Sequence, residues 1–163
     1  MPPLDPDTLE AQLLEAWQAN NRINLLLIDE ISEKGLRCTL STRGGRDVAR
    51  QLAHLHNVRV DHLKNRAKEL SEGLTKFESK VSPTRAQLKK AFKQSGKKVE
   101  TFLADVLQGR PKRRGFKRGI FTSLSYFIAH ESHHRGSILL TLKQSGHKLD
   151  QDTSYGIWAW DNI

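Results

Sequence analysis

The sequence predicts an all-α protein built as a four-helix bundle. Four long segments repeat apolar residues at helical spacing, a glycine follows each segment, and the alternating pattern of strands is almost absent. With 163 residues the chain has the usual size of one domain. We therefore expect a single domain over residues 1–163, with the tail 147–163 packed on the bundle.

The first helix is expected over residues 7–31, where apolar residues recur at three- and four-residue intervals. Asp5 or Asp7 can cap its first turn, and Gly35 stops it. The second helix is expected over residues 46–70 and ends before Gly73.

The third helix is expected to begin at Ser82 and Pro83, which suit the N-cap and the first helical position. Gly96 lies inside it, at a cost of about 1 kcal/mol relative to alanine. The fourth helix is expected over residues 120–145. The loop between the second and third helices is long enough to lie across one end of the bundle.

Composition narrows the functional classes. The 27 Lys and Arg residues against 18 Asp and Glu residues give a net charge of +9, which permits an acidic partner but does not specify one. The single Cys38 excludes a disulfide framework and a cysteine-rich zinc module, and it suits the reducing cytoplasm. The N-terminal stretch resembles no signal peptide, and the longest apolar run is far too short to span a membrane.

Histidines mark the candidate site. His130 and His134 are four residues apart in the fourth helix, so both rings lie on one face and can bind one metal ion. A third imidazole would come from the second helix, which carries His54 and His56. Helical-wheel position favours His56, because it lies near the middle of the apolar arc. Three protein ligands would leave open positions for water or substrate, as in catalytic sites.

Three segments resemble the DinB-like (damage-inducible) family of four-helix metalloproteins. The segment 126–138, YFIAHESHHRGSI, is similar to the final-helix motif H-x-x-H-H-R-G-Q-I of that family. The segment 46–63, with the sequence LAHL around His54, resembles its second-helix motif, and the end of the chain resembles the tail of one subgroup. The likeness covers nearly the whole chain, and the final-helix motif is its most specific part.

The resemblance implies an up-down-down-up bundle with a long crossover between helices two and three. It also implies a divalent metal, nickel or zinc, held by His54, His130 and His134, and we follow it over the helical wheel for His54. Characterised relatives are thiol-dependent transferases and an isomerase that use low-molecular-weight thiols. We therefore expect metal-dependent S-transferase or hydrolase chemistry on a small-molecule substrate. Ser137 stands where the family usually has glutamine, so no role is transferred from that glutamine.

Two other functions fit parts of the sequence. The residues 130–134, HESHH, satisfy the zinc-protease signature H-E-x-x-H, with Glu131 as its base, but no glutamate follows to serve as a third ligand and no sheet is expected to hold a peptide. The basic loop 110–118, with Lys112, Arg113 and Arg114, could grip phosphates of a nucleic acid, yet no DNA-binding motif accompanies it. A solvated basic face, or steering of anionic small molecules, is the simpler interpretation.

Two further expectations concern surfaces. Family likeness favours a homodimer, for which Trp17 and the basic third helix offer different faces. Trp158 and Trp160 in the tail are expected to pack on the bundle, or else to form a wall of the substrate pocket.

Overall fold

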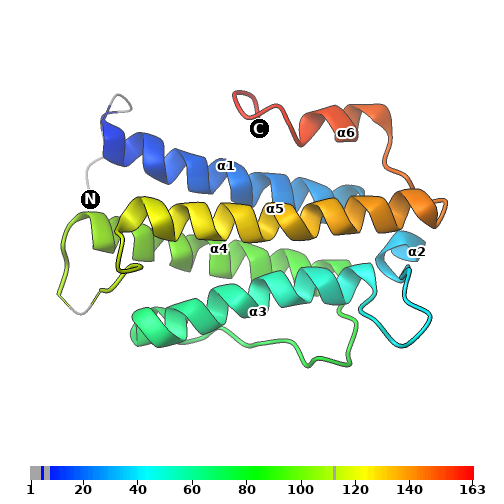
Figure 1. The fold of residues 1–163 in the computed structure, drawn as a ribbon, viewed down its shortest axis with the longest axis horizontal. Coiled ribbons are helices and arrows are strands. Elements are labelled where there is room, and N and C mark those ends of the chain that lie inside the picture. Colours follow the sequence, from blue (N-terminus) through cyan, green and yellow to red (C-terminus); the bar gives the residue numbers. More distant parts are fainter. Residues whose placement is uncertain (1–4, 6–7, 112) are drawn as a thin grey trace.

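The computed structural model describes residues 5, 8–111 and 113–163, and it is helical throughout its regular parts. Within these residues the only strand-like pairing is an isolated antiparallel bridge between Phe116 and Gly119. Four long helices form a bundle (Figure 1): α1 (Leu9–Glu30), α3 (Val48–Arg66), α4 (Arg85–Leu107) and α5 (Ile120–Gln144). Three short helices accompany them: α2 (Glu33–Leu36), η1 (Lys68–Ser71) and α6 (Gln151–Gly156). The predicted all-α bundle is confirmed.

The helices follow an up-down-down-up order. In Figure 1, α1 and α5 run in one direction, and α3 and α4 run in the other. The connection 67–84 therefore returns along the length of the bundle before α4 begins, and does not lie across one end as the sequence suggested. Helix α4 packs on α1 and α3, and α3 also packs on α5. The long crossover implied by family resemblance is confirmed.

The helix ends differ from the sequence prediction in four places. Gly35 does not stop the first helix: α1 ends at Glu30, and Gly35 lies inside α2. Thr8, not Asp5, caps α1, and Asp7 lies outside the described residues. The predicted second helix ends at Arg66, followed by the 3-10 turn η1. Helix α4 begins after Thr84 and not at Ser82 and Pro83, because Thr84 and Gln87 form a capping box that satisfies two free backbone N–H groups.

Gly96 has a packing reason for its place inside α4. The indole Nε1 of Trp17 donates a 2.9 Å hydrogen bond to the carbonyl oxygen of Gly96. A Cβ at Gly96 would come within 2.4 Å of the side-chain amide of Asn21. The glycine thus permits α1 and α4 to approach closely. Trp17 is only 1% exposed, so the expectation that it offers a dimer face is wrong.

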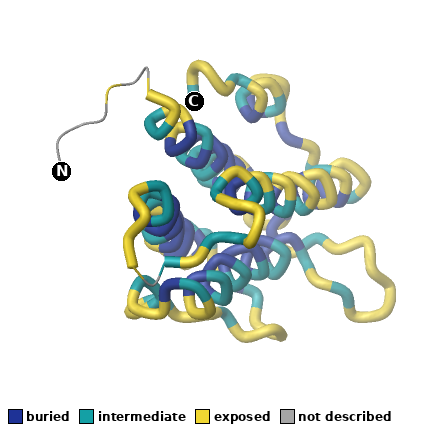
Figure 2. The backbone as a smooth tube through the Cα atoms, turned by 60° about the vertical axis from the view of Figure 1, so that its left-hand side comes forward, coloured by how far each residue is buried: buried dark blue, intermediate teal, exposed yellow. Residues whose placement is uncertain are grey.

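Figure 2 shows that buried positions on the long helices face the middle of the bundle, whereas the loops and the C-terminal tail are largely exposed. The tail contacts the bundle through α6, which packs on α1, and through the buried Leu149 and Ile157. Trp158 is 76% exposed and does not pack as expected, whereas Trp160 is 37% exposed and is partly covered. No helix in the described part of the chain has the length and apolarity to cross a membrane.

Candidate metal centre

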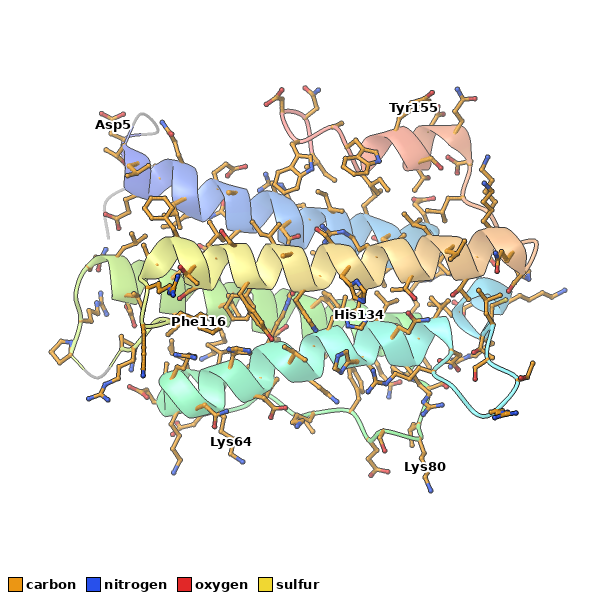
Figure 3. The ribbon with its side chains drawn as sticks, viewed as in Figure 1. Asp5, Lys64, Lys80, Phe116, His134 and Tyr155 are labelled. Atoms are coloured by element: carbon orange, nitrogen blue, oxygen red, sulfur yellow. The ribbon has the colours of Figure 1, made fainter. Side chains whose placement is uncertain are left out.

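Three histidines from two helices meet on one side of the bundle. His54 comes from α3, and His130 and His134 come from α5; Figure 3 shows His134 between these two helices. One ring nitrogen from each residue lies within 4.8 Å of the other two. The ring centroid of His54 is 5.5 Å from that of His130 and 4.9 Å from that of His134.

His56 does not join this cluster. It lies two residues beyond His54, which turns its side chain by about 200° around α3. Its ring is buried, lies near Thr75 with Nε2 3.1 Å from the carbonyl oxygen, and contacts the edge of Phe77 at a centroid distance of 5.4 Å. The helical wheel therefore identified a core histidine, because the middle of an apolar arc points into the core.

The electrostatics favour neutral imidazoles in the cluster. Partial burial is the main cause that lowers the pKa of His54, His130 and His134, and in His134 the pKa falls to about 4. Positive charge on neighbouring groups adds to this effect: Arg46 lowers the pKa of both His54 and His134. A neutral ring nitrogen has a free lone pair, which is the form that binds a metal.

The donor set fits a transition-metal ion such as zinc or nickel. Imidazole suits both metals. Nitrogen atoms bound to one zinc ion lie about 3–4 Å apart, because each is about 2.1 Å from the metal. The three ring nitrogens all lie within 4.8 Å of one another, so a small movement of the rings would bring them to that separation. We conclude that His54, His130 and His134 could together hold a divalent ion.

An aromatic wall borders the cluster toward the start of α5. Tyr126, one turn before His130, stacks on its ring with centroids 5.8 Å apart and planes 8° from parallel. His62, two turns beyond His54 on α3, packs against Tyr126 at 4.8 Å. Sequence reasoning missed both residues, although their spacing of four from His130 and eight from His54 places them on the site's face.

A cavity of about 420 Å³ opens on the other side of the cluster. His133, His134 and Ser137 from α5 line it, and so do residues of the chain between α2 and α3. Ser137, which departs from the family motif, is therefore part of the cavity wall. The tail tryptophans are not part of this wall, so the prediction that they form it is wrong.

Glu131 points into the core of the bundle. One carboxylate oxygen accepts a 2.6 Å hydrogen bond from Nε of Arg59, and the other accepts bonds from Arg59 (2.9 Å), Asn20 (2.6 Å) and Asn24 (2.7 Å). The residue is 1% exposed. Both oxygens are thus engaged inside the bundle, which leaves neither of them free as the base that a zinc protease needs.

Arg135 extends this buried polar network. It donates hydrogen bonds to the side-chain oxygens of Asn20 (2.8 Å) and Asn24 (3.0 Å). Because Glu131 and Arg135 each follow a histidine of the cluster, their bonds to α1 and α3 fix how α5 is rotated. This network was not predicted from the sequence. The sequence does carry one sign of a buried polar network, namely two asparagines four residues apart within the apolar stripe of α1.

The basic loop is partly neutralised. Arg113 pairs with Asp105 (2.9 Å) and with Glu69, and Arg110 also pairs with Asp105 (3.1 Å). Lys112 lies outside the described residues. In α4, Lys89 pairs with Asp29 and Lys97 with Glu100. These pairs agree with a solvated face better than with a surface reserved for phosphates.

Comparison with known proteins supplies one match. No curated protein and no solved structure matches the chain. The model of the DinB family matches residues 5–159, which is nearly the whole chain and includes all three clustered histidines. Together with the up-down-down-up bundle, this match means that the chain belongs to the DinB family.

Proposed function

We propose that this chain is a divalent-metal-dependent enzyme in which His54, His130 and His134 hold nickel or zinc. The observation that carries the proposal is the convergence of three imidazole nitrogens from α3 and α5 beside an open cavity. Three protein ligands are typical of catalytic metal sites, which keep positions open, and not of closed structural sites. Such an ion lowers the pKa of a thiol or water that it holds, and so supplies a nucleophile at neutral pH.

The side chains around the cluster have distinct tasks in this proposal. Stacking by Tyr126 restricts rotation of the His130 ring. The bonds of Glu131 and Arg135 keep α5 turned so that its two histidines face α3. The cavity beside His134 receives a small-molecule substrate, and its volume of about 420 Å³ falls within the range of ligand pockets.

We assign the reaction to thiol transfer, with a low-molecular-weight thiol as one substrate, since characterised members of the family use such thiols. Hydrolysis of a small molecule is the second candidate, because the same ligand set also suits activation of water. A protease is disfavoured by the buried Glu131, and nucleic-acid binding by the paired arginines of the basic loop. We further place the protein in the cytoplasm, for which its single cysteine is suited.

Metal content tests the proposal directly. Purified wild-type protein should contain stoichiometric nickel or zinc by elemental analysis, and His130→Ala and His134→Ala should lose most of it. The matched control is His133→Ala, which changes an exposed neighbour that points about 100° away from His134 around the helix. Full metal content in both ligand variants would show that the three histidines are not the ligands.

Activity separates the two reaction classes. Monochlorobimane becomes fluorescent when a thiol displaces its chloride, so metal-loaded protein should accelerate that reaction with low-molecular-weight thiols. The His134→Ala variant should not. Hydrolysis of a chromogenic ester without thiol-dependent acceleration would instead favour the hydrolase, and an inactive protein that retains its metal would restrict the proposal to metal binding.

A further inference from the structure

Arg46 borders two cavities, each of which contains a histidine of the cluster. It lines the cavity of about 420 Å³ that also contains His134, and it lines a smaller cavity of about 50 Å³ that contains His54. Of the residues around the larger cavity, only Arg46 also borders the smaller one. Arg46 therefore borders the space into which a molecule held next to the histidine cluster would extend.

The positive charge of Arg46 is not paired with any other side chain that the structure describes. Within the described part of the chain Arg46 has neither an ion pair nor a hydrogen bond to its side chain, whereas Arg50, one turn further on, donates to the carbonyl oxygens of Ser79 and Gly45. An unpaired cation at the border of both cavities favours a negatively charged ligand.

The wall of the larger cavity is complementary to an anion with a short carbon chain. No aspartate or glutamate is among the described residues that line it, whereas Glu78 lines the smaller cavity. Hydroxyl groups of Thr39, Ser41 and Ser137 line the larger cavity, and Leu40 and Leu140 supply apolar surface. A single guanidinium balances one negative charge and matches the two oxygens of a carboxylate, whereas a phosphate monoester carries nearly two charges at neutral pH.

We propose that the cavity beside His134 binds a small molecule that carries a carboxylate, which Arg46 grips while the reacting end of the molecule faces the histidine cluster. This inference rests on the proposed function in one respect: the reacting end of the ligand faces the histidine cluster because the reaction is proposed to take place there. It adds the chemical class of the substrate and names Arg46 as the residue that determines that class. For a thiol substrate, the ligand is a thiol with a carboxylate at the far end.

Two matched probes test the carboxylate. On nickel-loaded protein, calorimetry should give tighter binding of 3-mercaptopropionate than of 3-mercapto-1-propanol, which has the same number of carbon atoms but a neutral hydroxymethyl group in place of the carboxylate. Arg46→Gln should reduce this preference by about tenfold or more, because it removes the charge-assisted hydrogen bonds to the carboxylate. Arg43→Gln, which removes the same charge from an exposed loop residue outside both cavities, should leave the preference unchanged. An unchanged preference in Arg46→Gln would overturn the inference.

A second measurement does not depend on the metal. In metal-free protein, propionate should shift the NMR signal of the Arg46 Nε–H group, and 1-propanol should not. Elemental analysis decides the proposed function separately, so absence of metal with a propionate-induced shift refutes the metalloenzyme and retains the carboxylate site. No shift with propionate, or inorganic phosphate competing as well as propionate does, would refute the carboxylate class.

Discussion

The carboxylate of Glu131 and the guanidinium of Arg59 form an ion pair inside the bundle, with 2.6 Å between Oε1 and Nε and almost no solvent exposure of either side chain. The Arg59 guanidinium also lies over the rings of Trp17 and Phe92, at 4.7 Å and 4.6 Å from their centroids. A charge removed from water is costly unless it is paired and hydrogen-bonded, and here both oxygens of Glu131 accept bonds. The pair joins α3 to α5, the two helices that carry the clustered histidines.

Glu131→Gln should lower the free energy of unfolding by about 3–5 kcal/mol, because it leaves the buried Arg59 without its counter-charge. Urea unfolding measures this change. Glu100→Gln is the control: its pair with Lys97 (2.7 Å) lies at the surface, where one ion pair contributes at most about 1 kcal/mol. Equal losses in the two variants would contradict the structural role of the buried pair.

Replacing glycine by alanine should have opposite effects in α4 and α5. Gly96→Ala should destabilise the protein by about 1–3 kcal/mol, since the new methyl group meets the side chain of Asn21 at 2.4 Å. Gly136→Ala should stabilise it by up to about 1 kcal/mol, because nothing lies within 4 Å of the new Cβ and alanine favours the helix. Thermal unfolding of both variants tests this. Stabilisation by both would mean that Asn21 moves aside freely.

The four long helices could be predicted because their signals are local. Apolar periodicity identifies a helix from its own residues, and the positive-φ glycines Gly73, Gly109 and Gly146 lie where helical segments end. The His130 and His134 pair could be predicted for the same reason, since spacing of four within one helix settles their common face. Exact helix starts could not, because Thr84 competes with Ser82 as the cap.

The rest of the site depends on contacts between distant residues. Arg59 and Glu131 are 72 positions apart, and nothing in either local sequence pairs them. The choice between His54 and His56 likewise depends on where α5 crosses α3. A helical wheel ranks residues by distance from the apolar arc, which locates the core, whereas the histidine cluster lies at the edge between two helices. Family likeness supplied that missing tertiary information.

Replacement of His54 and replacement of His56, both in α3, should have different effects. His54→Ala should lose metal while the metal-free protein keeps its stability, because the ring is only partly buried at the surface of the bundle. His56→Ala should keep its metal but lose about 1–3 kcal/mol of stability, since it removes a buried ring beside Phe77 and its contact with the carbonyl oxygen of Thr75. Elemental analysis and urea unfolding measure the two effects. Metal loss from His56→Ala alone would support the helical wheel.

A homodimer remains a prediction, and the molecular mass of the particle in solution tests it. Light scattering at micromolar concentration should give twice the 18.6 kDa of one chain. Trp17 is buried within one chain and cannot contact a second subunit. Trp17→Phe should therefore leave the measured mass unchanged. A particle of 18.6 kDa would refute the dimer and would leave the metal site, which lies within one chain, unaffected.

The metal-free protein should lose stability as the pH falls below about 6.5. Burial and the positive charge of neighbouring groups lower the pKa of His134 from 6.5 to about 4, and burial lowers the pKa of His54 and His130 as well. A group whose pKa is lower in the folded state binds protons more readily when unfolded. Its contribution to stability is therefore complete above the unfolded pKa and is lost as the pH falls toward the folded one.

Urea unfolding of metal-free protein between pH 7.5 and 5 measures this effect, over a range chosen to stay above the usual pKa of carboxyl groups (about 4). The free energy of unfolding should decrease with falling pH, and His134→Ala should make the decrease shallower because one of the contributing groups is gone. Added nickel should stabilise the wild-type protein most at the upper end of the range, since protons compete with the ion for the same nitrogens. A free energy that does not change with pH in the metal-free protein would mean that the cluster opens to water and its histidines titrate as free side chains do.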